Sequence, residues 1–154
     1  PTDEGWLYLT WHKDLCTGEI VGYAMGERLS KYLVSESLFK ALELKHPKQG
    51  LLQHSDQGSQ YCSEDYQQLL RDRGISISMS RRGNCYDNAP MESFWGILKQ
   101  ELIHHRHYAT RSEAMNEIRE YIEIFYNRQR IQAKLGFLSP AAYARKYCAA
   151  LLTT

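Results

Sequence analysis

The sequence predicts an α/β fold in which a small mixed sheet is flanked by helices. Two segments with the aromatic and β-branched residues typical of strands come first, and a turn sequence separates them. A helical segment, a short strand, a second helix and another strand follow, and the rest of the chain has helical periodicity. This alternation is typical of α/β proteins and not of helical bundles or β-sandwiches.

The first two predicted strands form an antiparallel hairpin. Residues 6–11 and 19–25 are rich in aromatic and apolar side chains, and Cys16-Thr17-Gly18 supplies the turn between them. Residues 1–5, Pro-Thr-Asp-Glu-Gly, are a turn-type sequence that leads directly into the first strand. We therefore expect the chain to open on a hairpin loop, with a further segment upstream of it.

A helix is predicted from Ser30 to about Pro47, followed by a strand at residues 51–54. Ser63 is the expected cap of a second helix that ends at Gly74, and residues 75–79 alternate as a strand does. The apolar face of the first helix consists of Leu33, Val34, Leu38, Ala41 and Leu42.

Three helices are predicted in the second half of the chain. Asn88 caps a long helix that runs through about residue 106. Thr110 and Glu113 form a capping box that opens the next helix, and Ser139-Pro140 starts a short last one. The capping-box helix has an apolar stripe of Ala114, Ile118, Tyr121, Ile122 and Phe125. We divide the chain into a core at residues 1–138 and a short C-terminal helix and tail at 139–154.

Composition excludes several classes of protein. The 154 residues are 43% apolar and 12% aromatic, enough for the core of one globular domain. No stretch approaches the roughly 18 apolar residues of a membrane helix. The four cysteines lie far apart without a Cys-x-x-Cys pair, which argues against a zinc ribbon or a disulfide framework. We expect a cytoplasmic protein with reduced thiols.

The net charge of +1 conceals an uneven distribution. Residues 1–79 have 8 Lys and Arg against 11 Asp and Glu, whereas residues 80–154 have 11 against 7. The second half is therefore the candidate surface for a polyanion. Chance differences between solvated helices are an equally good explanation from the counts alone.

Two carboxylates are the candidates for chemistry. Asp56 follows a predicted strand, and ligand sites in α/β proteins gather at such strand ends. Glu92 lies in the first turn of the long helix. Each has a plain structural alternative, because Asp often caps a turn and a first-turn Glu is stabilised by the helix dipole. The two lie 35 residues apart, inside the polar motifs at residues 54–61 and 87–94.

At these motifs the sequence closely resembles the bacterial insertion-sequence transposases with a retroviral-integrase-type catalytic core, the DD(35)E group. The resemblance covers essentially the whole chain. Its other motifs are Gly5-Trp6-Leu7-Tyr8-Leu9, Ile20-Val21-Gly22, Ser78-Met79-Ser80, Gly83-Asn84, Phe94-Trp95-Gly96-Ile97-Leu98-Lys99, Tyr126-Asn127-Arg128-Gln129-Arg130 and Leu135-Gly136-Phe137-Leu138-Ser139-Pro140.

The resemblance implies a ribonuclease-H-like mixed sheet of five strands, the first of which lies upstream of the turn at Pro1. That strand carries a third carboxylate in the family, and Asp3 and Asp14 are poor substitutes for it. Without the first strand, the sheet has a central slot with unpaired backbone groups on both sides. We expect the chain on its own to be destabilised and at most weakly active.

The resemblance also implies the reaction, in which two Mg²⁺ ions held by three carboxylates support in-line attack on a DNA phosphate; Mn²⁺ can substitute. Asp56 and Glu92 would be two of the ligands, consistent with the preference of Mg²⁺ for carboxylate oxygens. His54, Gly58 and Asn88 would support them, His54 by orienting its strand end.

Basic side chains provide candidate DNA contacts. Lys99 is seven positions after Glu92 and therefore on the same helical face. Solvation alone is the alternative for each of the candidates, which are Lys99, Arg81, Arg82, Arg128, Arg130 and Lys134. Phosphate contacts of this kind position DNA without reading its sequence.

We interpret the chain as the catalytic core of a bacterial DDE transposase that acts on transposon ends and target DNA, as a homo-oligomer on DNA and without a membrane. One alternative is a non-catalytic fragment that at most binds DNA or oligomerises. The other is a nuclease of the same fold without joining activity.

Overall fold

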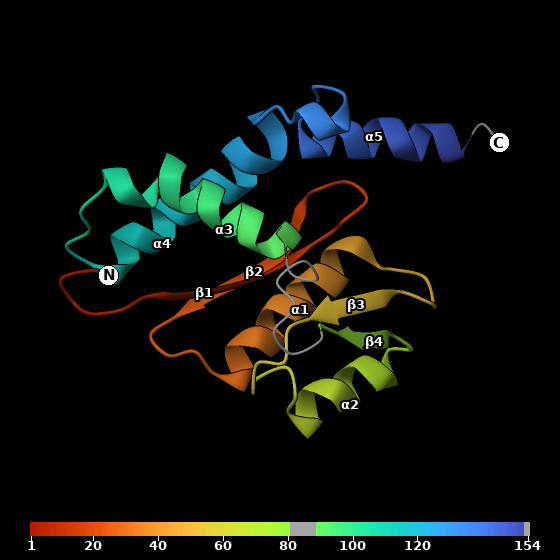
Figure 1. Ribbon diagram of the computed structural model, residues 1–154, viewed down its shortest axis with the longest axis horizontal. Helices are drawn as coiled ribbons and strands as arrows, with labels where there is room; N and C mark the ends of the chain where they lie inside the picture. Colours follow the sequence, from red (N-terminus) through yellow and green to blue (C-terminus); the bar gives the residue numbers. More distant parts are fainter. Residues whose placement is uncertain (81–88, 153–154) are drawn as a thin grey trace.

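A computed structural model describes residues 1–80 and 89–152 (Figure 1). The prediction of an α/β fold is confirmed. The elements in order are β1 (Tyr8–Lys13), β2 (Ile20–Gly26), α1 (Lys31–Lys45), β3 (Leu52–Ser55), α2 (Glu64–Asp72), β4 (Ser76–Met79), α3 (Ala89–Glu101), η2 (Ile103–His105), α4 (Arg111–Glu120), η3 (Tyr121–Gln129), η4 (Ala133–Leu135) and α5 (Pro140–Leu151).

The described strands form two separate pairs. β1 pairs with β2 in antiparallel register, with Trp11 opposite Tyr23. β3 pairs with β4 in parallel register, with Leu52 opposite Ser76. Each strand therefore has one described partner, and β1 and β3 each keep one edge without a strand beside it.

Alternation along β1 directs its side chains to opposite sides of the hairpin. The Thr10 hydroxyl donates to the carbonyl oxygen of Leu33 in α1, whereas the Trp11 ring packs against Phe94 and Trp95 of α3. Figure 1 shows α3 and α4 on one side of the hairpin and α1 on the other. The helices therefore enclose β1 and β2 between two layers.

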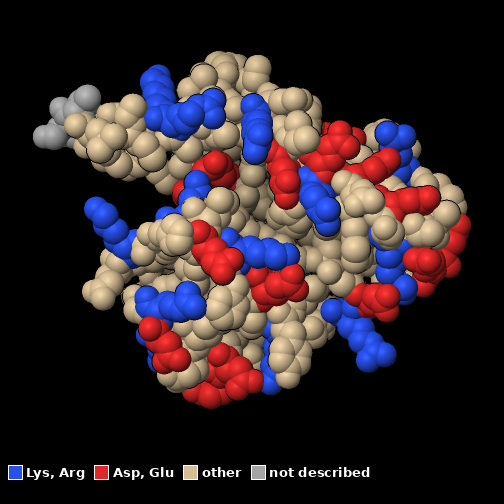
Figure 2. All heavy atoms as spheres, turned by 180° about the vertical axis from the view of Figure 1, so that it is seen from behind, with Lys and Arg blue, Asp and Glu red and all other residues tan. Residues whose placement is uncertain are grey.

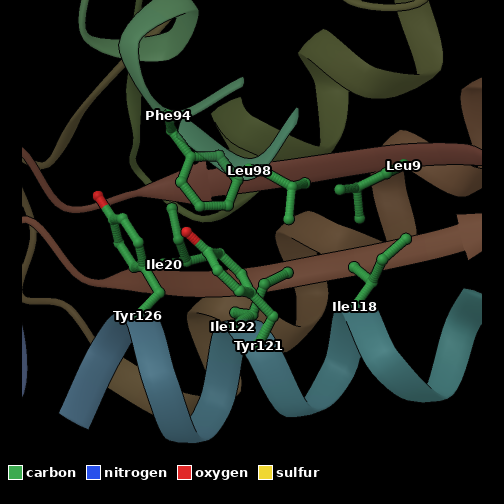
Figure 3. Close-up of a cluster of buried hydrophobic side chains, with 8 residues drawn as sticks. All are labelled: Leu9, Ile20, Phe94, Leu98, Ile118, Tyr121, Ile122 and Tyr126. Carbon is green, nitrogen blue, oxygen red and sulfur yellow. The ribbon is translucent and has the colours of Figure 1, made fainter. Parts of the chain in front are cut away.

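The main core lies between the hairpin and the helices α3, α4 and η3. In Figure 3 its side chains point toward one another from these elements. Phe94 is fully buried and meets Trp11 and Tyr126 edge to face, with ring centroids 5.2 and 4.8 Å away. The buried members are Leu9, Ile20, Phe94, Leu98, Ile118, Tyr121, Ile122 and Tyr126. This packing fixes α3, and with it Glu92, relative to the sheet.

The apolar stripe of the capping-box helix departs from the prediction at Phe125. Residues 121–129 form a π-helix, which ends with the Arg130 N–H donating to the carbonyl oxygen of Phe125. Five-residue spacing moves the buried face by one position. Phe125 is therefore 41% exposed, and Tyr126 is buried in its place.

Three helices start where the sequence predicted, after Ser30, Thr110 and Ser139, and each of these side chains accepts a backbone N–H of its helix. Thr110 forms the predicted capping box. Ser63 occupies the N-cap position of α2, but its hydroxyl donates to the carbonyl oxygen of Gln60, so it caps no helical N–H. The long helix ends at Glu101, about five residues earlier than predicted, and a short 3₁₀ turn follows.

Cys16, Cys62 and Cys148 are free thiols at exposed positions, in line with the predicted reduced state, and Cys85 lies outside the described residues. No helix in the described ranges is long and apolar enough to cross a membrane. The division at residue 138 stays a prediction; α5 begins just after it, with Ser139 as its cap.

His12 is held between β1, α1 and α2. The Ser37 hydroxyl donates to the carbonyl oxygen of Val34, so it accepts from His12 Nδ1 at 3.1 Å. The Tyr66 hydroxyl then donates to Nε2 at 3.2 Å. Both partners suit a neutral ring, and burial lowers the pKa of His12 to about 4.

We therefore expect the chain to lose stability as the pH falls from 6.5 toward 4, because the unfolded chain binds a proton at His12 that the folded chain does not. The loss at pH 5 is about 2 kcal/mol in the free energy of unfolding. Urea denaturation at pH 5 and 7.5 checks this. His12→Gln should flatten the pH dependence of the free energy of unfolding. His107→Gln, at an exposed position, should not. An equal pH dependence in these two variants and the unsubstituted chain would contradict the assignment of the effect to His12.

Candidate functional site

A cleft of about 1280 Å³ runs between β1 and β3. All six residues of β1 and all four of β3 line it, together with the apolar face of α1 and one face of α3. Asp56, Glu92 and Lys99 line the same cleft. The structure therefore brings both predicted carboxylates and one predicted cation to one cavity, which we call the β1–β3 cleft.

Asp56 directly follows β3 and is exposed. Its Oδ1 accepts the Gly58 N–H at 2.8 Å, and within the described residues its Oδ2 accepts no hydrogen bond. Tyr61 lies close by: burial and the Asp56 charge raise the pKa of the Tyr61 hydroxyl to about 12. The turn thus fixes one carboxylate oxygen and leaves the other for a ligand.

Gly58 fits this turn because it has no side chain. Its φ is not in the left-handed region, but a Cβ at this position would lie 2.9 Å from Asp56 Oδ1 and 3.2 Å from Gln60 Oε1. Gly58 therefore leaves room for the carboxylate to approach the backbone.

Gly58→Ala is accordingly expected to displace the Asp56 carboxylate with little cost in stability, about 1 kcal/mol or less, since the turn is at the surface. Nuclear magnetic resonance should show chemical-shift changes at residues 56–61 with the core signals unchanged. Gly50→Ala is the control for a glycine that is needed for its backbone conformation and not for space. Nothing lies within 4 Å of the added Cβ at this position, but its φ of +92° is strained for alanine. Unchanged shifts at residues 56–61 in Gly58→Ala would contradict the steric role.

His54 connects the ends of β3 and β4. Its Nδ1 lies 2.9 Å from the Ser78 hydroxyl and its Nε2 3.3 Å from the Ser80 hydroxyl. Both ring nitrogens are therefore engaged by serines of the neighbouring segment. This arrangement orients the strand end just before Asp56, as the sequence suggested, and does not need a metal at His54.

Glu92 and Lys99 lie on one face of α3. Glu92, Trp95 and Lys99 all line the cleft, as the helical spacing of Glu92 and Lys99 leads one to expect. Lys99 Nζ lies 4.9 Å from the centroid of the Trp95 ring, so the indole holds the ammonium group over this face. Within the described residues, Glu92 forms no hydrogen bond or ion pair.

The far end of α3 is anchored by a contact that the sequence did not predict. Arg130, assigned to DNA from the sequence, binds Glu101 through both Nε and Nη2 at 2.7–3.0 Å. The Tyr121 hydroxyl donates to the same carboxylate at 2.6 Å. Partial burial opposes ionisation of Glu101, but the hydrogen bonds from Arg130 and Tyr121 outweigh it and lower the carboxyl pKa. Arg130 therefore has a structural partner that joins α3 to η3.

The remaining predicted DNA contacts and supporting residues differ in where the structure places them. Arg81, Arg82 and Asn88 lie outside the described residues. Arg128 and Lys134 are exposed, and burial together with the Lys13 charge lowers the pKa of Lys134. On the face in Figure 2, basic side chains are interleaved with acidic ones, so that face is not uniformly basic.

Neither Asp3 nor Asp14 completes a three-carboxylate site. Asp14 also lines the β1–β3 cleft, and its Oδ1 accepts the Cys16 N–H at 2.8 Å in the same kind of turn as Asp56. Asp3 pairs with His107 at the surface. Among the described residues, no group of three His, Cys, Asp or Glu side chains is placed to hold a metal ion. Asp14 therefore does not join Asp56 and Glu92 in a three-carboxylate group, although all three line the cleft.

The α/β arrangement, with a strand-end aspartate and a helix-borne glutamate lining one cleft, agrees with the ribonuclease-H-like fold that the family resemblance implies. Comparison with known proteins agrees: residues 1–85 and 92–147 match models described as integrase core domain. The chain belongs to the integrase core domain family.

Bacterial relatives include the insertion element IS600 uncharacterized 31 kDa protein of Shigella sonnei, 58% identical over 95% of this chain and 54% of the relative. The transposase for insertion sequence element IS904 of Lactococcus lactis is 47% identical over 94% of this chain and 57% of the relative. Transposase InsF for insertion sequence IS3A of Escherichia coli is 41% identical over 94% of this chain and 50% of the relative. The chain spans about half the length of these relatives.

Solved structures with the same fold include retroviral integrases. The HTLV-2 integrase catalytic core domain in complex with magnesium has a TM-score of 0.62 at 13% identity, covering 89% of this chain and 92% of that one. A chain of the simian T-cell lymphotropic virus intasome has a TM-score of 0.68 at 16% identity, covering 85% of this chain and 46% of that one. These likenesses establish the fold.

Proposed function

We propose that the chain is the catalytic core of a DDE transposase that cleaves and joins DNA strands in a bacterial cytoplasm. The observation that carries this proposal is that Asp56 and Glu92, which have 35 residues between them in the sequence, line the same cleft from separate elements. Transposases among the bacterial relatives support the same activity.

Divalent metal ions fit this pair of residues. Asp56 offers Oδ2, Glu92 offers its carboxylate, and both are hard oxygen ligands of the kind Mg²⁺ prefers. A retroviral neighbour of this fold was solved with magnesium. When bound, two Mg²⁺ ions, or Mn²⁺ in their place, would neutralise charge on the attacking and leaving oxygens of a phosphate.

The protein's own groups would then position these ligands and the DNA. The Gly58 N–H fixes Asp56 Oδ1, and His54 holds the ends of β3 and β4 in register. The Phe94 core and the Glu101–Arg130 contact hold α3 in place. Lys99 can bind a DNA phosphate beside the carboxylates, and Arg128 and Lys134 can extend the contact along the backbone.

A non-catalytic DNA-binding or oligomerising chain is the second candidate. It is favoured because no group of three possible ligands is placed to hold a metal ion among the described residues, where the family resemblance implies three carboxylates. In both candidate functions, the chain would assemble as a homo-oligomer on DNA.

A joining assay separates these functions. A labelled oligonucleotide with a 3′-hydroxyl end is incubated with supercoiled plasmid and Mg²⁺ or Mn²⁺. We expect a low yield of metal-dependent joined product. Nicking without joining would favour a nuclease, and neither product, with DNA binding retained, would favour the non-catalytic chain.

DNA affinity is expected to fall steeply with salt, with log affinity linear in log salt concentration. Lys99→Gln should reduce the magnitude of that slope by about 1, because one phosphate contact is lost. Fluorescence anisotropy with labelled duplex DNA at several salt concentrations checks this. Lys40→Gln is the matched control, since Lys40 pairs with Glu36 on α1 and lies outside the cleft; equal slopes for both variants would remove Lys99 from the DNA site.

A further inference from the structure

Two buried polar side chains near the end of η3 lack hydrogen-bond partners. Tyr126 of η3 has no exposed surface, and Gln132, three residues beyond η3, is 8% exposed. Within the described residues, neither Tyr126 Oη nor Gln132 Nε2 forms a hydrogen bond of standard geometry. Buried polar atoms are normally paired, so two unpaired donors in one place point to a ligand.

The loop at residues 132–138 fixes the position of the Gln132 side chain. The Gln132 N–H donates to the Leu138 carbonyl oxygen at 3.0 Å, and the Gln132 carbonyl oxygen accepts the Phe137 N–H at 3.2 Å. Burial raises the pKa of the Tyr126 hydroxyl, and the nearby Gln132 amide opposes that rise. The two unpaired groups are therefore neighbours, and the backbone holds the amide in place.

Basic side chains gather around the same tyrosine. Lys13 Nζ lies 5.8 Å from the centroid of the Tyr126 ring. The Lys134 and Arg130 charges also oppose the rise in the pKa of Tyr126. Burial lowers the pKa of Lys13, and the Arg130 charge lowers it further. Side chains from β1, η3 and η4 thus bring positive charge to one buried hydroxyl.

Two of these charges are not matched by an acid. Arg130 binds Glu101 through Nε and Nη2, so these two charges offset each other. In the part of the chain that the structure describes, Lys13 and Lys134 form no ion pair. Burial lowers the pKa of Lys134, and the Lys13 charge lowers it further. A bound anion would relieve this repulsion and favour the charged form of both lysines.

The groups at this place are suited to an oxyanion. Each lysine ammonium carries three N–H donors, the amide nitrogen carries two, and the tyrosine hydroxyl carries one. A phosphate group presents several acceptor oxygens together with negative charge, and hydrogen bonds to such an anion are stronger than those between neutral groups.

We propose that a phosphate group binds here, held by two lysines and by the two buried donors. The site consists of Lys13, Tyr126, Gln132 and Lys134. Two sources share this chemistry, a phosphate of the DNA backbone and free inorganic phosphate. The DNA source rests on the proposed function, whereas binding of phosphate itself does not.

Inorganic phosphate is the probe for the first experiment. The full chain is titrated with sodium phosphate, without divalent metal, and followed by nuclear magnetic resonance. We expect saturable chemical-shift changes at the Gln132 side-chain amide and at the backbone amides of Lys13 and Lys134. Sodium chloride at the same ionic strength should not produce them.

Variants that remove one donor each locate the site. Tyr126→Phe keeps the ring and loses the hydroxyl, and Gln132→Leu loses the amide. Each should weaken phosphate binding about tenfold, because a hydrogen bond to a charged group is lost. Tyr32→Phe is the matched control, since Tyr32 is 76% exposed on α1, and should bind phosphate as the unsubstituted chain does.

Stability without phosphate separates a binding role from a structural one. Tyr126→Phe removes a buried hydroxyl that has no partner, so the variant should be at least as stable as the unsubstituted chain in urea denaturation. A hydroxyl that pairs within the protein would instead make Tyr126→Phe less stable.

Duplex DNA distinguishes the two sources of phosphate. If the DNA backbone is the source, duplex DNA without metal should shift the Gln132 side-chain signal, and inorganic phosphate should compete with it. If free phosphate is the source, the DNA should leave that signal unchanged. Phosphate binding without any DNA joining would count against the proposed function alone, and joining without phosphate binding would count against this inference alone.

Three results would overturn the proposal. The first is the absence of saturable shifts with inorganic phosphate, and the second is equal shifts with sodium chloride. The third is a Tyr126→Phe variant that loses stability and binds phosphate as the unsubstituted chain does.

Discussion

Replacing Phe94 with alanine is expected to lower the free energy of unfolding by about 3 to 5 kcal/mol. Phe94 has no exposed surface and contacts both Trp11 and Tyr126 edge to face. Its removal leaves a cavity at the place where α3, η3 and the β1–β2 hairpin meet. Urea denaturation followed by circular dichroism measures the loss as a lower midpoint at unchanged slope.

Phe125 offers the matched control for this prediction. It is the same residue type on η3, but it is 41% exposed, so Phe125→Ala should cost about 1 kcal/mol or less. The sequence pattern alone places Phe125 in the core. A large loss for Phe125→Ala would contradict the π-helical winding of residues 121–129, and a small loss for Phe94→Ala would contradict the place of Phe94 in the core.

Asp56→Asn and Glu92→Gln are each expected to reduce metal-dependent DNA nicking by about 100-fold or more, equivalent to about 2.7 kcal/mol in the activation free energy. Each variant keeps the shape of the side chain but removes a charged metal ligand from the β1–β3 cleft. Nicking of supercoiled plasmid with Mn²⁺, measured by gel electrophoresis, gives the rates.

Glu36→Gln is the matched control for the carboxylate variants. Glu36 is an exposed acid on α1 that pairs with Lys40, and its replacement should leave nicking unchanged. Residual nicking by Asp56→Asn or Glu92→Gln at the rate of the unsubstituted chain would exclude that carboxylate from the reaction.

Local signals in the sequence predicted much of the fold. The aromatic strands, the capping box at Thr110 and the helix starts at Ser30 and Ser139 all follow from neighbouring residues. Helical and strand periodicity is a local property, so one sequence suffices to find it.

Features that depend on distant residues were not predicted. Arg130 and Glu101 are 29 positions apart, so their ion pair cannot be inferred from helical spacing. The π-helix that buries Tyr126 in place of Phe125 follows from packing against Phe94. A side chain at Gly58 would crowd the Asp56 carboxylate two residues earlier, and this close approach exists only in the folded turn.

We propose that Asp56 and Glu92 together bind a divalent cation in the β1–β3 cleft. Titration of Mn²⁺ into the chain, followed by electron paramagnetic resonance of the free ion, tests this directly. We predict that Asp56→Asn and Glu92→Gln each weaken Mn²⁺ binding at least tenfold while Glu36→Gln binds as the unsubstituted chain does. Equal Mn²⁺ affinity in all four proteins would contradict the claim.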